Sequence, residues 1–567
     1  MGHFWSGACR LKITGFAAIL LAAAISATAA APAADAGRDA YRENAFEAMQ
    51  WAMLSSAGNA VQQLGLRAAA GSPELAEIVR RRQDLVALVG DREKKLAELG
   101  GEGAASQADM AVRLRGEIDS LLAELQGIDE RLKAEFPRYS ELANPAPLKI
   151  AEVQALLEDD EALLVVFAGK YNVYTMAIAR DAVDWSQAVY GAATLAGDVA
   201  ELRLQLDPDA AGNRGAAPIG GNDDVPRVAR FDRFRAHLLY TELVAPVAHV
   251  LAGARHVFTV ADGPLSGLPF SVMVTEPPRG DDTDAAAMRR TAWMIRQFAM
   301  TTLPSVSSLA VIRRFPPVAP AVAARPFVGF GAPDFDGRQA QAQATAVATA
   351  QASFFRGALA NLDAVRNLPA LPQTGPELRK LAAELGAGED ALFLGPRATE
   401  SAVRGSDLAD VRILAFATHG LLSGDLQGLA EPALAFSPPE AASVDDDGLL
   451  TASEVSELRL SADWVILSAC NTAGGDGRAD GEGLSGLARA FLYAGARAIL
   501  ASHWPVRDDA AARLTTRAIG ALASGERQRR SEALRGAMLS LMDDESDPSL
   551  AHPSAWAPFV VVGEGGY

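Results

Sequence analysis

The stretches RILAFATHG at residues 412–420 and DWVILSACNTAGG at residues 463–475 decide the fold of this chain. Each begins with a continuous apolar run, which is typical of a strand buried on both faces of a parallel sheet. The first run ends in His419 and the second in Cys470, and a glycine follows each within a loop. Sites in parallel α/β sheets assemble beyond the carboxyl ends of the strands. The pattern therefore predicts that His419 and Cys470 lie at one edge of one sheet.

Further apolar runs of the same kind lie on both sides of these two stretches. The expected strands are 162–167, 173–179, 256–260, 326–331, 411–417 and 464–469. Helical patterns alternate with them at 231–251, 375–385 and 484–494. Strands that alternate with helices predict an α/β fold with a mostly parallel sheet flanked by helices.

The preceding region, residues 32–147, has a different character. From residue 40 to residue 136 it is almost free of proline, and its apolar residues recur at helical spacing. One stripe contains Ile78, Leu85, Val89 and Leu96, and a second contains Ile118, Leu121, Leu122, Leu125, Ile128 and Leu132. Glycines at 100, 101 and 103 separate the stripes, so we expect a hairpin of two long antiparallel helices. Such stripes form the core of the hairpin, with docking of a partner as the alternative.

Composition excludes several classes of function. The 567 residues carry a net charge of −18, which opposes binding of nucleic acid. The seven histidines and two cysteines form no HxxxH or CxxC pair, so we expect no metal site. GEGLSG at 481–486 follows a loop and not a strand, which argues against a dinucleotide cofactor, and we expect none. The acidic run at 445–447 lacks a full set of oxygen ligands for calcium and is expected to be a solvated loop.

The first 31 residues have the pattern of a signal peptide. Arg10 and Lys12 precede an apolar run from Ile13 to Ile25, and small residues that suit cleavage follow. The alternative is a membrane anchor, but this run is short of the roughly 20 residues that span a bilayer. We therefore expect an exported protein without a stable membrane span. Cleavage would remove Cys9 and leave Cys470 as a single thiol, either an inert buried residue or a reactive one.

Several motifs together resemble the CHAT domain, a branch of the caspase, separase and gingipain group of cysteine peptidases. They are DGPLSGLPF at 262–270, LPSVSSL at 303–309, LPALPQTGPEL at 368–378, FATHG at 416–420, GLAEPAL at 428–434, DGLLTASEV at 447–455, VILSACNTAGG at 465–475 and GEGLSGLARAFLYAGARAILASHWPV at 481–506. The resemblance extends over residues 148–567. It implies a caspase-like fold with a non-catalytic lobe at 148–315 and a catalytic lobe at 324–567.

The resemblance also implies roles for particular residues. His419 matches the general base of the family and Cys470 the nucleophile, and the backbone N–H groups of Gly420 and Cys470 match its oxyanion hole. Asp508 matches an acidic residue that binds a basic substrate side chain in separases. The adjacent Asp509 is a rival for that role, and a helix N-cap is an alternative role for Asp508.

Two classes of function follow from these roles. The first is a cysteine endopeptidase that cleaves a protein or peptide substrate, with a preference for cleavage after basic residues. The second is a catalytically idle scaffold or signalling module that binds a partner through its helical region. The intact His419–Cys470 pair favours the first.

Overall fold

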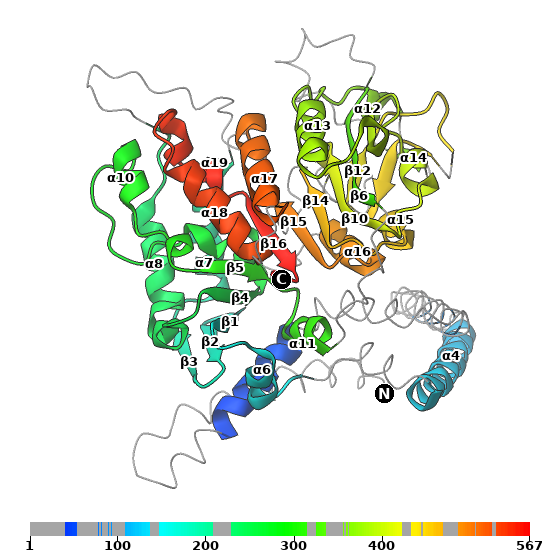
Figure 1. Ribbon diagram of the computed structural model, residues 1–567. Coiled ribbons are helices and arrows are strands. Elements are labelled where there is room, and N and C mark those ends of the chain that lie inside the picture. Colours follow the sequence, from blue (N-terminus) through cyan, green and yellow to red (C-terminus); the bar gives the residue numbers. More distant parts are fainter. Residues whose placement is uncertain are drawn as a thin grey trace. The chain divides into compact units, whose positions relative to one another are not determined.

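The computed structural model describes residues 40–53, 78, 81, 85, 89, 92, 108–135, 147–207, 228–314, 325–335, 355–356, 359–360, 362–421, 432–443, 446–468, 486–504, 506–523 and 529–566. The expected signal segment and Cys9 lie outside these residues. The described residues fall into two compact units, one between residues 59 and 146 and the other formed by the rest (Figure 1).

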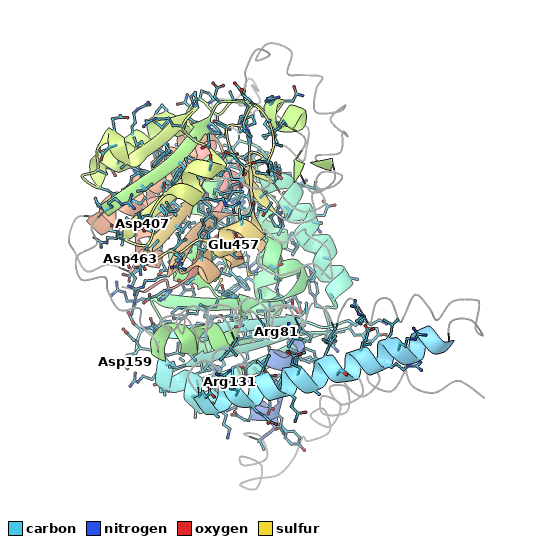
Figure 2. All side chains as sticks on the ribbon, turned by 90° about the vertical axis from the view of Figure 1, so that its right-hand side faces the viewer. Arg81, Arg131, Asp159, Asp407, Glu457 and Asp463 are labelled. Carbon is cyan, nitrogen blue, oxygen red and sulfur yellow. The ribbon has the colours of Figure 1, made fainter. Side chains whose placement is uncertain are left out.

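The smaller unit is built around α4 (Ala108–Glu135). Two ion pairs, Arg81–Glu124 and Arg92–Glu117, connect α4 to helical positions earlier in the chain, both at 2.7 Å (Figure 2 labels Arg81). The earlier arginine, Arg81, pairs with the later glutamate of α4, and the later arginine, Arg92, pairs with the earlier glutamate. The two segments therefore run antiparallel, as the hairpin prediction requires. Buried positions in this unit are Ile78, Leu85, Val89, Leu114 and Ile118.

An eleven-stranded sheet organises the larger unit, in the order β3-β2-β1-β4-β5-β16-β15-β14-β10-β6-β9. Its strands are β1 (Glu161–Ala168), β2 (Val173–Ala179), β3 (Val183–Ala188), β4 (His256–Ala261), β5 (Ala299–Thr302), β6 (Arg325–Pro333), β9 (Leu392–Gly395), β10 (Val411–Ala417), β14 (Trp464–Leu467), β15 (Ala498–Ser502) and β16 (Phe559–Gly563). The antiparallel pairs are β1–β2, β2–β3 and β15–β16, and the other neighbouring pairs are parallel. The mostly parallel α/β sheet predicted from the sequence is confirmed.

The helices of this unit are α6 (Ile150–Leu156), α7 (Ala192–Leu206), α8 (Arg233–Leu243), α9 (Ala248–Leu251), α10 (Ala285–Arg290), α11 (Val306–Arg314), α12 (Leu362–Arg366), α13 (Thr374–Glu384), α14 (Glu400–Gly405), α15 (Ala452–Glu457), α16 (Gly486–Ala494), α17 (Asp508–Ala523), α18 (Arg530–Met542) and α19 (Pro553–Trp556). A small antiparallel sheet contains β11 (Gly420–Leu421), β12 (Ala433–Ala435) and β13 (Leu449–Thr451). The single helix expected over 231–251 is interrupted by a 3₁₀ turn at Ala245–Val247, because Pro246 has no N–H to donate within a helix.

The pairing of β16 reverses the direction of the sheet. β16 runs parallel to β5 and antiparallel to β15. The strands β1, β4 and β5 therefore end at one edge of the sheet, whereas β6, β10, β14 and β15 end at the opposite edge. His419, which follows β10, lies at the second of these edges.

Buried side chains cover both faces of the sheet. In β1 the side chains of residues 162–166 are all fully buried, and they alternate between two cores. One core contains residues of α7, α8, α13, α17 and α18, and the other contains residues of α6, α11 and the helix over 40–53. Because both faces are covered, β1 is a continuous apolar run instead of an alternating one.

The helix over 40–53 packs with the sheet unit. Its residues Phe46 and Met49 belong to the same core as Val153. The side-chain amide of Gln50 donates to the carbonyl of Leu148 at 2.8 Å and accepts from the Leu148 N–H at 2.9 Å. This side chain thereby satisfies the backbone of the segment that leads into α6.

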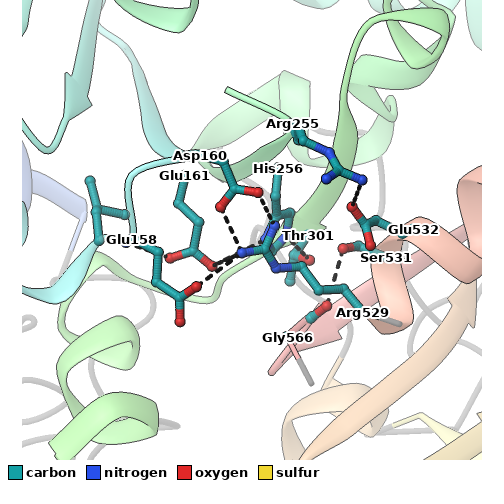
Figure 3. Close-up of polar contacts among 12 residues, drawn as sticks. Glu158, Asp160, Glu161, Arg255, His256, Thr301, Arg529, Ser531, Glu532 and Gly566 are labelled. Carbon is teal, nitrogen blue, oxygen red and sulfur yellow. Dashed lines mark hydrogen bonds and ion pairs between the residues drawn. The ribbon is translucent and has the colours of Figure 1, made fainter. Parts of the chain in front are cut away.

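A buried ionic cluster joins the segment before α18 to the start of β1 (Figure 3). The Arg529 side chain is 2% exposed. It donates to both carboxylate oxygens of Asp160, at 2.8 and 2.7 Å, and to Glu158 at 3.1 Å. Nearby on the surface, Arg255 pairs with Glu532 at 3.0 Å. The contacts of Arg529 connect residues 369 and 371 positions apart in the chain.

His256 and Thr301 lie beside this cluster. Nε2 of His256 is 2.7 Å from Oγ1 of Thr301, and Nδ1 is 3.5 Å from Glu161. Glu161, His256 and Thr301 are connected in the order carboxylate, imidazole and hydroxyl, as in a hydrolytic triad. His256 and Thr301 are, however, both 0% exposed. Burial lowers the pKa of His256. With no access for a substrate, this trio is a structural network.

Within the described residues, no helix is both long enough and apolar enough to cross a membrane. The same residues contain no cluster of three or more His, Cys, Asp or Glu side chains suited to a metal ion.

Candidate active site

The two strands that precede His419 and Cys470 in the sequence are neighbours in the sheet. β10 and β14 are parallel neighbours, and Phe416 pairs with Leu467. The hydrogen bonding to β10 continues one residue beyond β14, because the Ser468 N–H donates to the Phe416 carbonyl at 2.9 Å. His419 follows Phe416 by three residues, and Cys470 follows Leu467 by three residues. Cys470 itself lies outside the described residues.

Aromatic packing fixes β10 in its place. The Phe416 ring stacks on Phe330 of β6 at 5.6 Å and contacts Phe491 of α16 at 5.1 Å. At the carboxyl ends of β6 and β10 the backbones approach closely. A Cβ atom on Gly331 would lie only 2.6 Å from the carbonyl oxygen of Ala417. Position 331 therefore requires glycine. Gly331 pairs with Ala417, which precedes His419 by two residues.

The backbone carbonyl of Pro369 orients His419. Nε2 of His419 lies 2.7 Å from this oxygen. A carbonyl can only accept a hydrogen bond, so Nε2 carries the proton and the lone pair of the neutral ring is on Nδ1. The ring also contacts Phe335, with a centroid distance of 5.7 Å. The sequence prediction missed Pro369, although it lies in the LPALPQTGPEL motif.

Gly420 belongs to the small sheet. It pairs with Leu434 of β12, and the Ala435 N–H donates to the carbonyl of His419 at 3.0 Å. Thr418 donates to the carbonyl of Ala435. These bonds hold the backbone on both sides of His419, as a fixed oxyanion donor at Gly420 would require.

Glu377 of α13 is a second residue that the sequence prediction missed. Its side chain is buried, with 5% exposure. Oε2 accepts from the Ser468 hydroxyl at 3.3 Å, and Oε1 accepts from the Thr515 hydroxyl of α17 at 2.9 Å. An acidic residue inside an apolar helix face was the signal available in the sequence, because a buried carboxylate requires partners.

α17 begins at Asp508, but the side chain of Asp508 is not among those that the structure describes. Asp509 accepts hydrogen bonds from Arg507, at 3.0 and 2.7 Å. Burial opposes its ionisation, but the bonds and charge of Arg507 outweigh burial and lower the pKa of Asp509. The rival carboxylate is therefore already paired within the chain.

The segment that follows β15 is anchored by α7 and by α19. Arg203 of α7 donates to the carbonyl of His503 at 2.8 Å, and the Trp504 indole donates to Ser554 at 3.1 Å. Burial lowers the pKa of His503 to about 3, so its ring is neutral. His503 therefore adds no positive charge to this edge of the sheet at neutral pH.

Comparison with solved structures gives only weak likenesses. A separase–securin complex of Saccharomyces cerevisiae matches with a TM-score of 0.40 at 8% identity, over 84% of this chain and 37% of that one. The Arg-specific cysteine proteinase gingipain R matches with a TM-score of 0.30 at 11% identity, over 59% of this chain and 67% of that one. At these TM-scores neither likeness decides a question of fold or activity.

Among curated proteins, Tetratricopeptide repeat protein 28 of Mus musculus is 31% identical over 161 residues, and its Homo sapiens counterpart is 34% identical over 115 residues. These matches cover 26% and 20% of this chain, and the chain spans only 6% and 4% of the length of these two relatives. The family model of the CHAT domain matches residues 234–564, which include His419, Cys470 and Asp508. That match extends over more than half of the sequence, and the chain belongs to the CHAT domain family.

Proposed function

We propose that this chain is a cysteine endopeptidase of the caspase/separase type, with His419 as general base and Cys470 as nucleophile. The observation that carries the proposal is the register of β10 and β14. Phe416 pairs with Leu467, and His419 and Cys470 each follow one of these two positions by three residues in the sequence. The Pro369 carbonyl supports it further, because it leaves the lone pair of His419 on Nδ1.

In the proposed reaction Nδ1 of His419 accepts the thiol proton of Cys470. The thiolate attacks the carbonyl carbon of the scissile peptide bond, and the N–H groups of Gly420 and Cys470 stabilise the oxyanion. When the C–N bond breaks, the imidazolium returns its proton to the leaving amine. Water then attacks the thioester, again with His419 as base, and releases the acid and the free thiol. The Pro369 carbonyl stabilises the imidazolium, because it accepts a hydrogen bond from Nε2–H throughout.

The test measures the reactivity of Cys470 as a function of pH. Iodoacetamide modification is followed at the Cys470 peptide by mass spectrometry, which separates it from Cys9. We expect a pH midpoint below the roughly 8.5 of a free cysteine, and a return toward that value in His419→Ala. A fluorogenic peptide library should be cleaved by the wild type and not by Cys470→Ala. If Cys470 resists alkylation in the folded protein, even after limited proteolysis, the idle scaffold becomes the better description.

We further propose that Asp508 lines the pocket for a basic substrate side chain. A carboxylate forms a charge-assisted, often bidentate pair with a guanidinium, and it is costly to bury without that partner. The pairing of Asp509 with Arg507 supports Asp508 as the available carboxylate. The net charge of −18 would also favour the approach of basic substrates at low salt.

Reporter peptides that end in Arg, Lys, Asp or Leu test the specificity. The wild type should prefer Arg or Lys, and Asp508→Asn should lose most of that preference while Cys470 stays reactive. Asp509→Asn is the matched control and should keep the preference, because Arg507 already occupies that carboxylate. A preference for Asp peptides, or loss in the Asp509 variant alone, would place the pocket elsewhere.

A further inference from the structure

Glu377 is 93 positions from Cys470 in sequence, yet its carboxylate accepts a hydrogen bond from the side chain of Ser468, two residues before Cys470. Oε2 of Glu377 accepts from the hydroxyl of Ser468, at 3.3 Å. Ser468 precedes Cys470 by two residues, and its own N–H is bonded to the carbonyl of Phe416 on β10. Ser468, the residue that follows β14, is therefore held from two sides, by the neighbouring strand and by α13.

The segment that carries Glu377 also reaches His419. Pro369 lies eight residues before Glu377, and its carbonyl accepts from Nε2 of His419 at 2.7 Å. Between the two, Thr374 fixes the start of α13, since its hydroxyl accepts from the Ala332 N–H at 3.1 Å and donates to the Leu371 carbonyl at 2.8 Å. One short stretch, 369–377, thus contacts the ends of β10 and β14 and is itself anchored to the end of β6.

The other oxygen of Glu377 extends the connection to α17. Oε1 accepts from the hydroxyl of Thr515 at 2.9 Å, a hydroxyl that is also 2.9 Å from the Ala511 carbonyl. Thr515 follows Asp508 by seven residues, or about two turns of the same helix. The carboxylate therefore lies between the segment before Cys470 and the helix that begins with Asp508.

We propose that Glu377 is a positioning residue, which fixes the segment before Cys470 against the segment that orients His419. A carboxyl group suits this task because it has two oxygens, and each of them accepts from a different hydroxyl. At 5% exposure water does not compete well for either oxygen. The catalytic meaning of this role rests on the proposed peptidase function, whereas the positioning of Cys470 can be measured without it.

The experiment compares Glu377→Ala, Glu377→Gln and Ser468→Ala with Thr516→Val. Thr516 is a neighbouring α17 residue of equal burial, and its hydroxyl has no hydrogen-bond partner among the described residues, so it serves as the control for a change in the core. The readouts are the rate and the pH midpoint of Cys470 alkylation, kcat and KM on the best reporter peptide, and the melting temperature. Each is measured on the full chain.

We expect Glu377→Ala and Ser468→Ala to lower kcat on the order of 10- to 100-fold with little change in KM, since a misplacement of about 1 Å has this effect on reacting groups. Their alkylation midpoints should move toward that of His419→Ala. Glu377→Gln should recover most of the rate, because an amide can accept from one hydroxyl and donate to the other. Thr516→Val should leave rate and midpoint as in the wild type.

The proposal is overturned if Glu377→Ala and Ser468→Ala match Thr516→Val in alkylation rate and midpoint and differ only in melting temperature. If Glu377→Ala does not fold, Ser468→Ala decides the question alone. Failure of the peptidase proposal has a different signature, namely a wild type whose midpoint equals that of His419→Ala and which cleaves no peptide. Even then, a change in the Cys470 alkylation rate with Glu377→Ala, relative to Thr516→Val, supports the positioning role.

Discussion

Asp160 accepts two hydrogen bonds from a guanidinium that is almost completely buried, and its loss should be felt across the whole sheet unit. The bonds from Arg529 measure 2.8 and 2.7 Å, a bidentate geometry (Figure 3). Arg529 directly precedes α18, whereas Asp160 directly precedes β1. Replacement of Asp160 by Ala removes both bonds and leaves the Arg529 charge with two carboxylates, Glu158 at 3.1 Å, which is 52% exposed, and the buried Glu161 at 3.7 Å.

The size of the effect follows from these contacts. Each hydrogen bond to a charged group contributes about 1.5–3 kcal/mol to the free energy of unfolding. Asp160 is 32% exposed and Glu158 still pairs with Arg529, so the lower end of the sum applies. We expect Asp160→Ala to cost about 3 kcal/mol, consistent with the removal of one partner from a buried ion pair.

Arg255→Ala is the matched control, because it breaks an ion pair between the segment before β4 and α18 at the protein surface. Arg255 is 72% exposed, and its bond to Glu532 is a single one of 3.0 Å. Exposed pairs of this kind contribute less than about 1 kcal/mol. The assay is urea denaturation followed by tryptophan fluorescence, since Trp293, Trp464 and Trp556 are buried in this unit.

The pH dependence gives a second check on the same pair. Hydrogen bonding to Arg529 lowers the pKa of Asp160. A carboxyl with a lowered folded-state pKa stabilises the protein fully above its ordinary pKa of about 3.9, and this stabilisation is lost as the pH falls through the folded-state value. The difference between wild type and Asp160→Ala should therefore be constant from pH 5 to 8 and shrink below pH 4.

Two results would refute the reasoning about this cluster. The first is an Asp160→Ala variant with the same free energy of unfolding as Arg255→Ala. That result would mean that bonds to water fully replace the buried bonds of Asp160. The second is a difference that stays unchanged as the pH falls from 5 to 3, because below the ordinary carboxyl pKa protonation of Asp160 in the unfolded chain must reduce the stabilisation.

Two other substitutions test the surroundings of the site. Burial raises the pKa of Glu400 to about 8, so the stabilising contribution of Glu400 is complete below about pH 4.5 and is lost as the pH rises toward 8. Glu400→Gln should therefore have a higher melting temperature than the wild type at pH 8 and should lose this pH dependence. Equal melting temperatures of the two proteins across this pH range would contradict the prediction. Gly331→Ala should lower stability by about 1–3 kcal/mol and reduce peptide cleavage, because the new methyl group would collide with the Ala417 carbonyl. Gly405→Ala, which meets no atom within 4 Å, should do neither.

The six expected strands were predictable because their signal is local, whereas the sequence prediction missed β3, β5, β9, β15 and β16. β2 and β10 have the limits expected from their apolar runs, and β1, β4 and β6 differ by one or two residues. Helix α13 likewise begins and ends within one residue of the expected range. A continuous apolar run bounded by turn residues defines a buried strand whatever its neighbours are. The helix expected over 231–251 failed at Pro246, where the apolar spacing continues although the hydrogen bonding cannot.

The candidate site was predictable only in part. His419 and Cys470 carry side chains whose chemistry is visible in the sequence, and the apolar runs before them predicted strands that end at one edge. Pro369 acts through a backbone carbonyl, which every residue possesses, so no residue type could have indicated it. Glu377 was visible as an acidic residue, but its partners Ser468 and Thr515 are 91 and 138 positions away.

The sequence by itself determined six of the eleven strands of the sheet, that the sheet is mostly parallel, and which reactive residues follow its strands. These properties depend on the spacing and chemistry of residues close together in the chain. Only the tertiary structure decided that β16 lies between β5 and β15 and reverses the direction of the sheet. It alone also showed the bonds from 369–377 to His419 and Ser468. Such contacts depend on how distant segments pack, and many pairings satisfy the same local pattern until the whole core is assembled.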